Sequence, residues 1–329
     1  MRRALTITVI VILAAIAGCG QPTGQKTGKP AGKEMLTVDF QKGQTLRYKF
    51  VSSREITVDW GQMESNSPQA KTRVDKSTES IELVVSYEPI EIDPYGGTKV
   101  KATCESAKVT GLKQRGTRQD AAETFAGKTW TFTVGPTGKI DDYSQLYAVI
   151  REAGKQAIRP DTSQGTVKEP DMIYDVIATQ WFLWDSISSR QNVAAGLSPG
   201  DQWKSLLSAP APMILWVARD VIYRLDEIRE DPNGRVAVIH SSYTPYKDIP
   251  SNWPVPYEVR FQMSGMFGFL RNYQVQSLSG EGEELFNINA GRTEKYNQKY
   301  HLEVLSSLPM GLGITPKISI DQNLTMQLL

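Results

Sequence analysis

The chain has 329 residues, 37 basic and 36 acidic side chains, and a formal net charge of +1. This near-neutral balance gives no sign of the basic face that nucleic acid requires, so a nucleic-acid partner is not expected. The length fits one large β-rich domain or two smaller ones. Seven Trp, thirteen Tyr and nine Phe can fill a large core or line an apolar cavity.

The N-terminal segment 1–18 has the pattern of an export signal. Arg2 and Arg3 precede an uncharged stretch over residues 4–17. A positive start followed by an apolar region of about 7–15 residues is typical of a signal peptide, and a membrane-spanning helix needs about 20 apolar residues. We therefore expect residues 1–18 to be a signal peptide that is removed on export.

The cleavage region Ile16-Ala17-Gly18-Cys19 resembles the lipobox of bacterial lipoprotein precursors at all four positions. The resemblance implies that a diacylglyceryl group is attached to Cys19 and that cleavage falls before it. Two or more acyl chains hold a protein stably at a membrane. Two alternatives are an uncleaved anchor helix and an ordinary signal peptide with a coincidental cysteine.

The residue after the lipidated cysteine would be Gly20. It is not the aspartate that keeps lipoproteins of enteric bacteria at the inner membrane. The resemblance thus implies an exported protein that is anchored at a membrane, and at the outer membrane facing the periplasm in a host with two membranes. Residues 19–34 lack large apolar side chains apart from Cys19 and are rich in Gly, Pro, Thr and Lys, which predicts a flexible tether with a reach of roughly 20 Å.

Beyond residue 35, a period-two alternation of apolar and polar residues predicts β-strands. Turn chemistry at residues 93–97 and 231–234 predicts two hairpins. Glu281, Glu283 and Glu284, beside Gly280 and Gly282, are interpreted as a charged turn between strands. The predicted strands cover residues 44–51, 80–87, 99–109, 130–134, 221–228, 235–243, 257–263, 270–278, 284–288, 295–305 and 318–328.

Two helices are predicted between the two groups of strands. The first begins near Asp141, Asp142 or Ser144, which can cap it, and runs to about residue 157. The second covers residues 170–190, and its apolar arc is too wide for a helix with one face in water. Such a helix is either buried in a core or lines an apolar cavity.

These elements predict an α+β fold, mainly antiparallel β, with a large curved sheet or half-barrel of about ten to eleven strands and an inserted pair of helices. We expect a single β-rich domain over residues 35–329. A further hypothesis divides it into related halves, 35–140 and 195–329, that flank the helical insertion 141–190.

The order of elements resembles the half-barrels of Lol-type bacterial lipoprotein carriers and receptors and of mycobacterial lipid-binding lipoproteins. It is also similar to an uncharacterised family of bacterial lipoproteins of about this length. The resemblance lies in the order of elements and in the hairpin context at Lys42-Gly43 and Gly234-Arg235. It implies a lipid-binding sheet and assigns no individual residue a role.

The sequence contains no catalytic or metal-binding motif that indicates a particular reaction. His240 and His301 lie in predicted strands without ligands at metal-binding spacing, so no metal or other cofactor is expected. The chain has no Gly-x-Ser-x-Gly motif, and a role other than catalysis is favoured. If Cys19 is lipidated, Cys104 has no disulfide partner in the chain, and its strand position predicts a buried thiol.

The aromatic and methionine-rich segments are the candidates for function. Large aromatics and flexible methionines suit pockets for hydrophobic ligands. The sequence therefore favours a membrane-anchored cell-envelope lipoprotein that binds a lipid or other hydrophobic ligand in a concave apolar sheet. The alternatives are an aromatic core without a ligand, and a structural or assembly lipoprotein that binds other envelope proteins. The candidate ligand-binding residues are Ile177, Trp181, Phe182, Trp184, Trp216, Met263 and Phe267.

Overall fold

A computed structural model describes residues 33–61, 73–111, 120–157, 172–190, 195–207, 209–211, 214–246, 271–308 and 315–329. All of them belong to one compact unit, Lys33–Leu329. The predicted signal peptide, Cys19 and the predicted strand at 257–263 lie outside the described residues.

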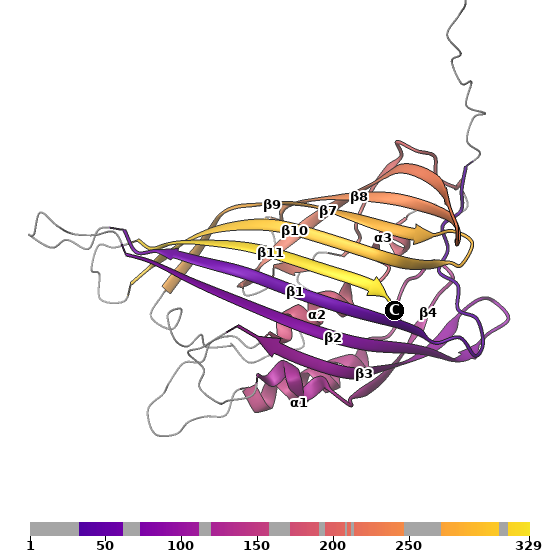
Figure 1. Ribbon diagram of the computed structural model, residues 1–329, viewed down its shortest axis with the longest axis horizontal. Coiled ribbons are helices and arrows are strands. Elements are labelled where there is room, and N and C mark those ends of the chain that lie inside the picture. Colours follow the sequence, from indigo (N-terminus) through magenta and orange to yellow (C-terminus); the bar gives the residue numbers. More distant parts are fainter. Residues whose placement is uncertain are drawn as a thin grey trace, which may run out of the picture. The chain divides into compact units, whose positions relative to one another are not determined.

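The described chain forms one open, curved sheet of eleven strands (Figure 1). The strand order is β4-β3-β2-β1-β11-β10-β9-β8-β7-β5, and β6 pairs with β7. Neighbouring strands are antiparallel throughout. This confirms the predicted α+β class with a large curved sheet. The strands are β1 (Leu46–Asp59), β2 (Val74–Ile92), β3 (Thr98–Thr110), β4 (Thr129–Val134), β5 (Gln202–Lys204), β6 (Ala209–Ala211), β7 (Ile214–Asp231), β8 (Gly234–Tyr246), β9 (Arg271–Asn287), β10 (Arg292–Ser307) and β11 (Lys317–Leu328).

The first and last strands of the chain meet in the middle of the sheet. Ile56 of β1 lies opposite Ile320 of β11, so β1–β4 extend the sheet on one side and β11–β5 on the other. Alternate side chains are buried along strands such as β1, where Tyr48, Phe50 and Ile56 are buried. We call the face that carries these buried side chains the inner face and the opposite, polar face the outer face.

Strand β9 corrects the prediction of a charged turn at residues 280–284. The strand runs without interruption from Arg271 to Asn287. Gly280 and Gly282 point to the inner face, where tyrosines occupy the space beside them: a Cβ on Gly282 would lie 2.6 Å from the hydroxyl oxygen of Tyr243. The glycines therefore mark close packing inside a strand.

The helices also differ from the prediction, because the expected helix over 170–190 is divided in two. The described helices are α1 (Ser144–Ala157), α2 (Ile173–Trp181), α3 (Asp185–Ser188) and a short 3-10 helix, Ala121–Phe125. At the break, Trp184 adopts a left-handed backbone conformation with φ of 58°, which a continuing right-handed helix does not allow.

Helices α2 and α3 lie on the inner face of the sheet (Figure 1). The start of α1 agrees with the predicted cap, since the carboxylate of Asp142 accepts a hydrogen bond of 2.8 Å from the Ser144 amide. Within the described residues, no helix has the length and apolar character needed to span a membrane.

Candidate functional site

Three of the predicted ligand-binding residues, Ile177, Phe182 and Trp184, are buried on the inner face. The backbone of Trp181 ends α2 and that of Trp216 lies in β7, but their side chains are outside what the structure describes. Met263 and Phe267 also lie outside the described residues. Ile177 lies within α2, and Phe182 and Trp184 lie at the break between α2 and α3.

Trp184 is the centre of an aromatic stack. Its ring meets Phe40 at 5.4 Å, Tyr87 at 6.0 Å and Phe132 at 6.4 Å between ring centroids. The contacts with Phe40 and Tyr87 are edge-to-face and that with Phe132 is tilted, and aromatic pairs of this kind add stability beyond the buried area. The indole nitrogen of Trp184 is buried and has no hydrogen-bond partner in the described part of the chain. The left-handed turn thus directs the largest side chain of this region into the inner face.

A buried ionic group, which we call the Asp175 cluster, joins α2 to the sheet. It consists of Ser52, Arg54, Glu79, Asp175 and Gln322, all less than a tenth exposed. The Asp175 carboxylate accepts hydrogen bonds of 2.7 Å from the Ser52 hydroxyl, 2.6 Å from the Gln322 amide and 2.8 Å from Arg54. Arg54 also binds Glu79, at 2.8 Å through Nε. Its one positive charge is therefore shared by two carboxylates.

A second group, the Arg219 cluster, consists of Phe182, Arg219, Tyr243, Tyr296 and Tyr300. The guanidinium carbon of Arg219 lies 4.7 Å from the ring centroid of Phe182, 4.8 Å from Tyr243 and 5.1 Å from Tyr300. Arg219 is 1% exposed. Its Nε and Nη1 atoms, and the hydroxyl of Tyr300, have no hydrogen-bond partner among the described residues.

Tyr296 belongs to the Arg219 cluster because its hydroxyl group is hydrogen-bonded to that of Tyr243. The hydroxyls of Tyr243 and Tyr296 are 3.0 Å apart, and Ser241 lies 2.8 Å and 3.2 Å from them. Burial raises the pKa of Tyr243 and Tyr296 above the ordinary range. These phenols are therefore neutral hydrogen-bonding groups at physiological pH, and Arg219 provides the positive charge of the cluster.

Two buried carboxyl groups lie nearby, and both are engaged by hydroxyl groups. Asp185 accepts hydrogen bonds from Ser189, Ser205 and Tyr223 at 2.6–2.7 Å. Burial raises its pKa in spite of these bonds. Its charge attracts that of Arg219, but no hydrogen bond joins the two in the described structure.

Glu284 is the second of these carboxyl groups. It accepts hydrogen bonds of 2.5 Å from both Ser186 and Thr293. Burial is the main reason why its pKa is raised to about 7. The group is therefore partly protonated at neutral pH.

The raised pKa of Glu284 predicts a pH-dependent stability. The folded protein holds this proton up to about pH 7, whereas the unfolded chain releases it near its ordinary pKa of 4.5. The folded state thus binds more protons in this interval, so its stability is greatest below the unfolded pKa and falls as pH rises through about 7. This difference in pKa between the folded and unfolded states corresponds to about 3 kcal/mol in the free energy of unfolding.

We expect Glu284→Gln to be more stable than the wild type at pH 7.5 and to lose most of this advantage at pH 4.5. Urea unfolding at a series of pH values measures the free energy of unfolding of the variant and of the wild type. Glu283→Gln is the matched control, since Glu283 is exposed on the outer face of the same strand. If the difference in free energy of unfolding between Glu284→Gln and wild type did not change with pH, this would contradict the raised pKa of Glu284.

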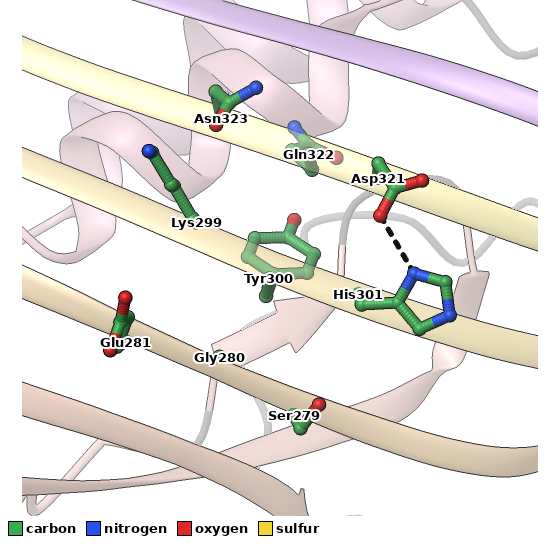
Figure 2. A pocket seen from close by; sticks show the side chains of 9 residues that line it. All are labelled: Ser279, Gly280, Glu281, Lys299, Tyr300, His301, Asp321, Gln322 and Asn323. Carbon is green, nitrogen blue, oxygen red and sulfur yellow. Dashed lines mark hydrogen bonds and ion pairs between the residues drawn. The ribbon is translucent and has the colours of Figure 1, made fainter.

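The outer face has a shallow polar depression of about 460 Å³ across β9, β10 and β11 (Figure 2). In it the His301 Nδ1 atom lies 2.7 Å from the Asp321 carboxylate. A second depression, of about 350 Å³, reaches β1 and β2 and shares Asp321 and Asn323 with the first. The first is lined by Ser279, Gly280, Glu281, Lys299, Tyr300, His301, Asp321, Gln322 and Asn323.

Neither face shows a metal-binding arrangement within the described ranges, where no three His, Cys, Asp or Glu side chains come together to hold an ion. Cys104 is buried and is not in a disulfide, and burial raises the pKa of its thiol to about 12. Its thiol is therefore protonated and unreactive at neutral pH. This confirms the predicted buried thiol.

The charged residues of the inner face were not identified as site residues from the sequence. A signal was present, because Arg219 shares its strand face with Val221, Tyr223 and Leu225. A charged residue at an apolar position of an alternating strand indicates a buried ionic group. The sequence did not show which groups it meets, because these come from the residue after α2 and from β8 and β10.

Comparison with known proteins places the chain in no family. No family model and no curated protein matches it. Among solved structures it is similar to lipovitellin, from a study of lipid–protein interactions, with 9% identity and a TM-score of 0.46. That similarity covers 88% of this chain and 25% of lipovitellin, so the chain spans about a quarter of that protein.

A second similar structure is DynF from the dynemicin biosynthesis pathway of Micromonospora chersina. It shows 8% identity and a TM-score of 0.18, with 93% of this chain and 92% of DynF covered. Neither similarity is close enough to indicate what this chain binds.

Proposed function

We propose that the protein is a membrane-anchored cell-envelope lipoprotein that holds a lipid or another hydrophobic ligand against the inner face of its sheet. The N-terminal sequence supports the anchor, because the segment ending at Cys19 matches the lipobox at four positions. The sheet supports the ligand site, because its two faces differ: the inner face is apolar and aromatic, and the outer face is polar.

One observation carries the proposed ligand site. In native proteins about nine in ten buried polar groups or more have a hydrogen-bond partner. On the inner face, several buried polar atoms have none in the described structure, and those of Trp184, Arg219 and Tyr300 lie among aromatic rings. An amphiphile fits such a surface, because its polar group can bond these atoms while its chain contacts the rings. The atoms are Trp184 Nε1, Arg219 Nε and Nη1, Gln298 Oε1, Tyr300 Oη and Gln322 Oε1.

Metabolic labelling with a photoreactive fatty acid tests the anchor and the ligand site in the same cells. Bacteria expressing the full chain receive a fatty acid that carries an alkyne and a diazirine. The proposal predicts alkyne label at Cys19 without irradiation and further label, only after irradiation, on peptides of α2, β8 and β10. Peptide mapping by mass spectrometry distinguishes the two.

Cys19→Ser is the matched control for the anchor. It should lose the label that does not need irradiation and should release the protein from the membrane fraction. Label at Cys19 alone, with and without irradiation, would remove support for the ligand site and leave an anchored protein. Label that persists in Cys19→Ser without irradiation would contradict the anchor.

A second candidate function is supported by the outer face. The two depressions that share Asp321 and Asn323 extend across β2, β1, β11, β10 and β9 and offer a broad polar surface to another envelope protein. A photoreactive amino acid at Asn323 tests this in cells. A discrete crosslinked protein at Asn323, absent when the probe replaces exposed Tyr95, is the expected result. No specific crosslink at Asn323 would count against this role.

A further inference from the structure

We propose that Arg219 binds the anionic head group of the ligand, a carboxylate or a phosphate, while the three surrounding rings contact the carbon atoms next to it. This inference rests on the proposed hydrophobic-ligand site and narrows the ligand to an anionic amphiphile.

The surroundings of Arg219 leave its hydrogen-bonding capacity open. The rings of Phe182, Tyr243 and Tyr300 lie 4.7–5.1 Å from the guanidinium carbon. Aromatic rings attract a cation through their faces, but a benzene ring does not accept the in-plane hydrogen bonds of a guanidinium as an oxygen does. Two of these donor atoms, Nε and Nη1, have no partner within the described ranges. Carboxylates and phosphates are the groups that accept guanidinium hydrogen bonds most strongly.

Two strand arginines with buried side chains, Arg54 and Arg219, provide an internal comparison. Arg54 is bound by two carboxylates, Glu79 and Asp175. Arg219 is as deeply buried, and none of the described carboxylates forms an ion pair or a hydrogen bond with it. Burying a charge is costly unless it is paired and hydrogen-bonded. A ligand anion would pair the charge of Arg219 and accept its hydrogen bonds, as the two carboxylates do for Arg54.

The nearest acidic groups do not fill this role. The carboxylate of Asp185 is held by Ser189, Ser205 and Tyr223. That of Glu284 is held by Ser186 and Thr293, and its raised pKa leaves it partly neutral at pH 7. Asp185 therefore attracts Arg219 without forming a hydrogen bond with it, and Nε and Nη1 of Arg219 have no acceptor among the described residues.

Three matched photoreactive probes test the inference on the purified full chain in lipid nanodiscs. They share one alkyl chain with a diazirine and end in a carboxylic acid, a phosphate monoester or an alcohol. The acid and the phosphate separate a fatty acid from a phospholipid-like ligand, and the alcohol reports binding of the chain alone. The readout is the amount of crosslink on peptides that contain Phe182, Tyr243 or Tyr300.

We expect at least one anionic probe to label these peptides about tenfold more than the alcohol, the gain for a hydrogen bond to a charged group. Arg219→Gln should abolish that preference and keep the labelling by the alcohol. Arg224→Gln is the control, since Arg224 is on the same strand but exposed and paired with Asp226, and it should keep the preference.

Each other outcome has a separate meaning. Equal labelling by all three probes in the wild type would overturn the role of Arg219 and leave the hydrophobic site standing. A preference that survives in Arg219→Gln would also overturn it. No labelling by any probe would overturn both this inference and the proposed function. The wild-type comparison needs no variant, so it decides the question even if Arg219→Gln does not fold.

Discussion

Replacing Asp175 with alanine should lower the free energy of unfolding by about 3–5 kcal/mol, the usual cost of removing one partner of a buried ion pair. The loss is large because Asp175 accepts three hydrogen bonds, from Ser52, Arg54 and Gln322. Without it, Arg54 keeps only Glu79 as a counter-charge, and the hydrogen bonds to Asp175 that join α2 to β1 and β11 are lost. Urea unfolding followed by circular dichroism measures the change.

Asp321→Ala is the matched control for this prediction. Asp321 is likewise a carboxylate with a basic partner, His301, but it lies on strand β11 and is exposed on the outer face. Surface ion pairs contribute about 0–1 kcal/mol, so this variant should stay close to wild type. Similar losses for the two variants would show that the Asp175 cluster is not a buried ionic group.

Trp184→Ala should also lower the free energy of unfolding, by about 3–5 kcal/mol, because it removes a buried indole and leaves a cavity. The ring is 2% exposed and contacts Phe40, Tyr87 and Phe132. The same measurement, with Tyr95→Ala as the control, tests this. Tyr95 is 91% exposed, and we expect its change to remain within about 0.5 kcal/mol.

The backbone at Trp184 allows a sharper version of the test. At a φ of 58° alanine is strained by about 1 kcal/mol and glycine is not. Trp184→Gly should therefore be more stable than Trp184→Ala by about this amount, although glycine is the poorer residue in a right-handed helix. The reverse order would indicate that the α2–α3 break does not depend on this turn.

Local patterns were sufficient to predict the sheet. Period-two alternation predicted β1 at residues 44–51, residues 318–328 were predicted as the last strand, and the turn at Asp231–Gly234 located the β7–β8 hairpin. All of these depend on near neighbours in the sequence. The exception at residues 280–284 has a non-local cause: Gly280 and Gly282 resemble turn residues, but tyrosines from other strands occupy their side-chain space.

The inner-face site could be predicted only in part, because its contacts are made between distant residues. Helix 170–190 indicated the aromatic layer, and Phe182 and Trp184 are indeed buried there. Asp175 reaches Ser52 across 123 positions and Gln322 across 147. A helical aspartate gives no sequence signal for such partners, so the polar part of the inner face emerged only from the structure.

Native mass spectrometry of the mature full chain, released from detergent micelles, tests the central claim most directly. The proposed function predicts the mass of the chain from Cys19 with its covalent anchor, and in addition a noncovalent mass of lipid size. Denaturation should remove the second mass and leave the first. A native spectrum that shows the covalently anchored chain alone, identical in mass to the denatured one, would contradict a ligand on the inner face.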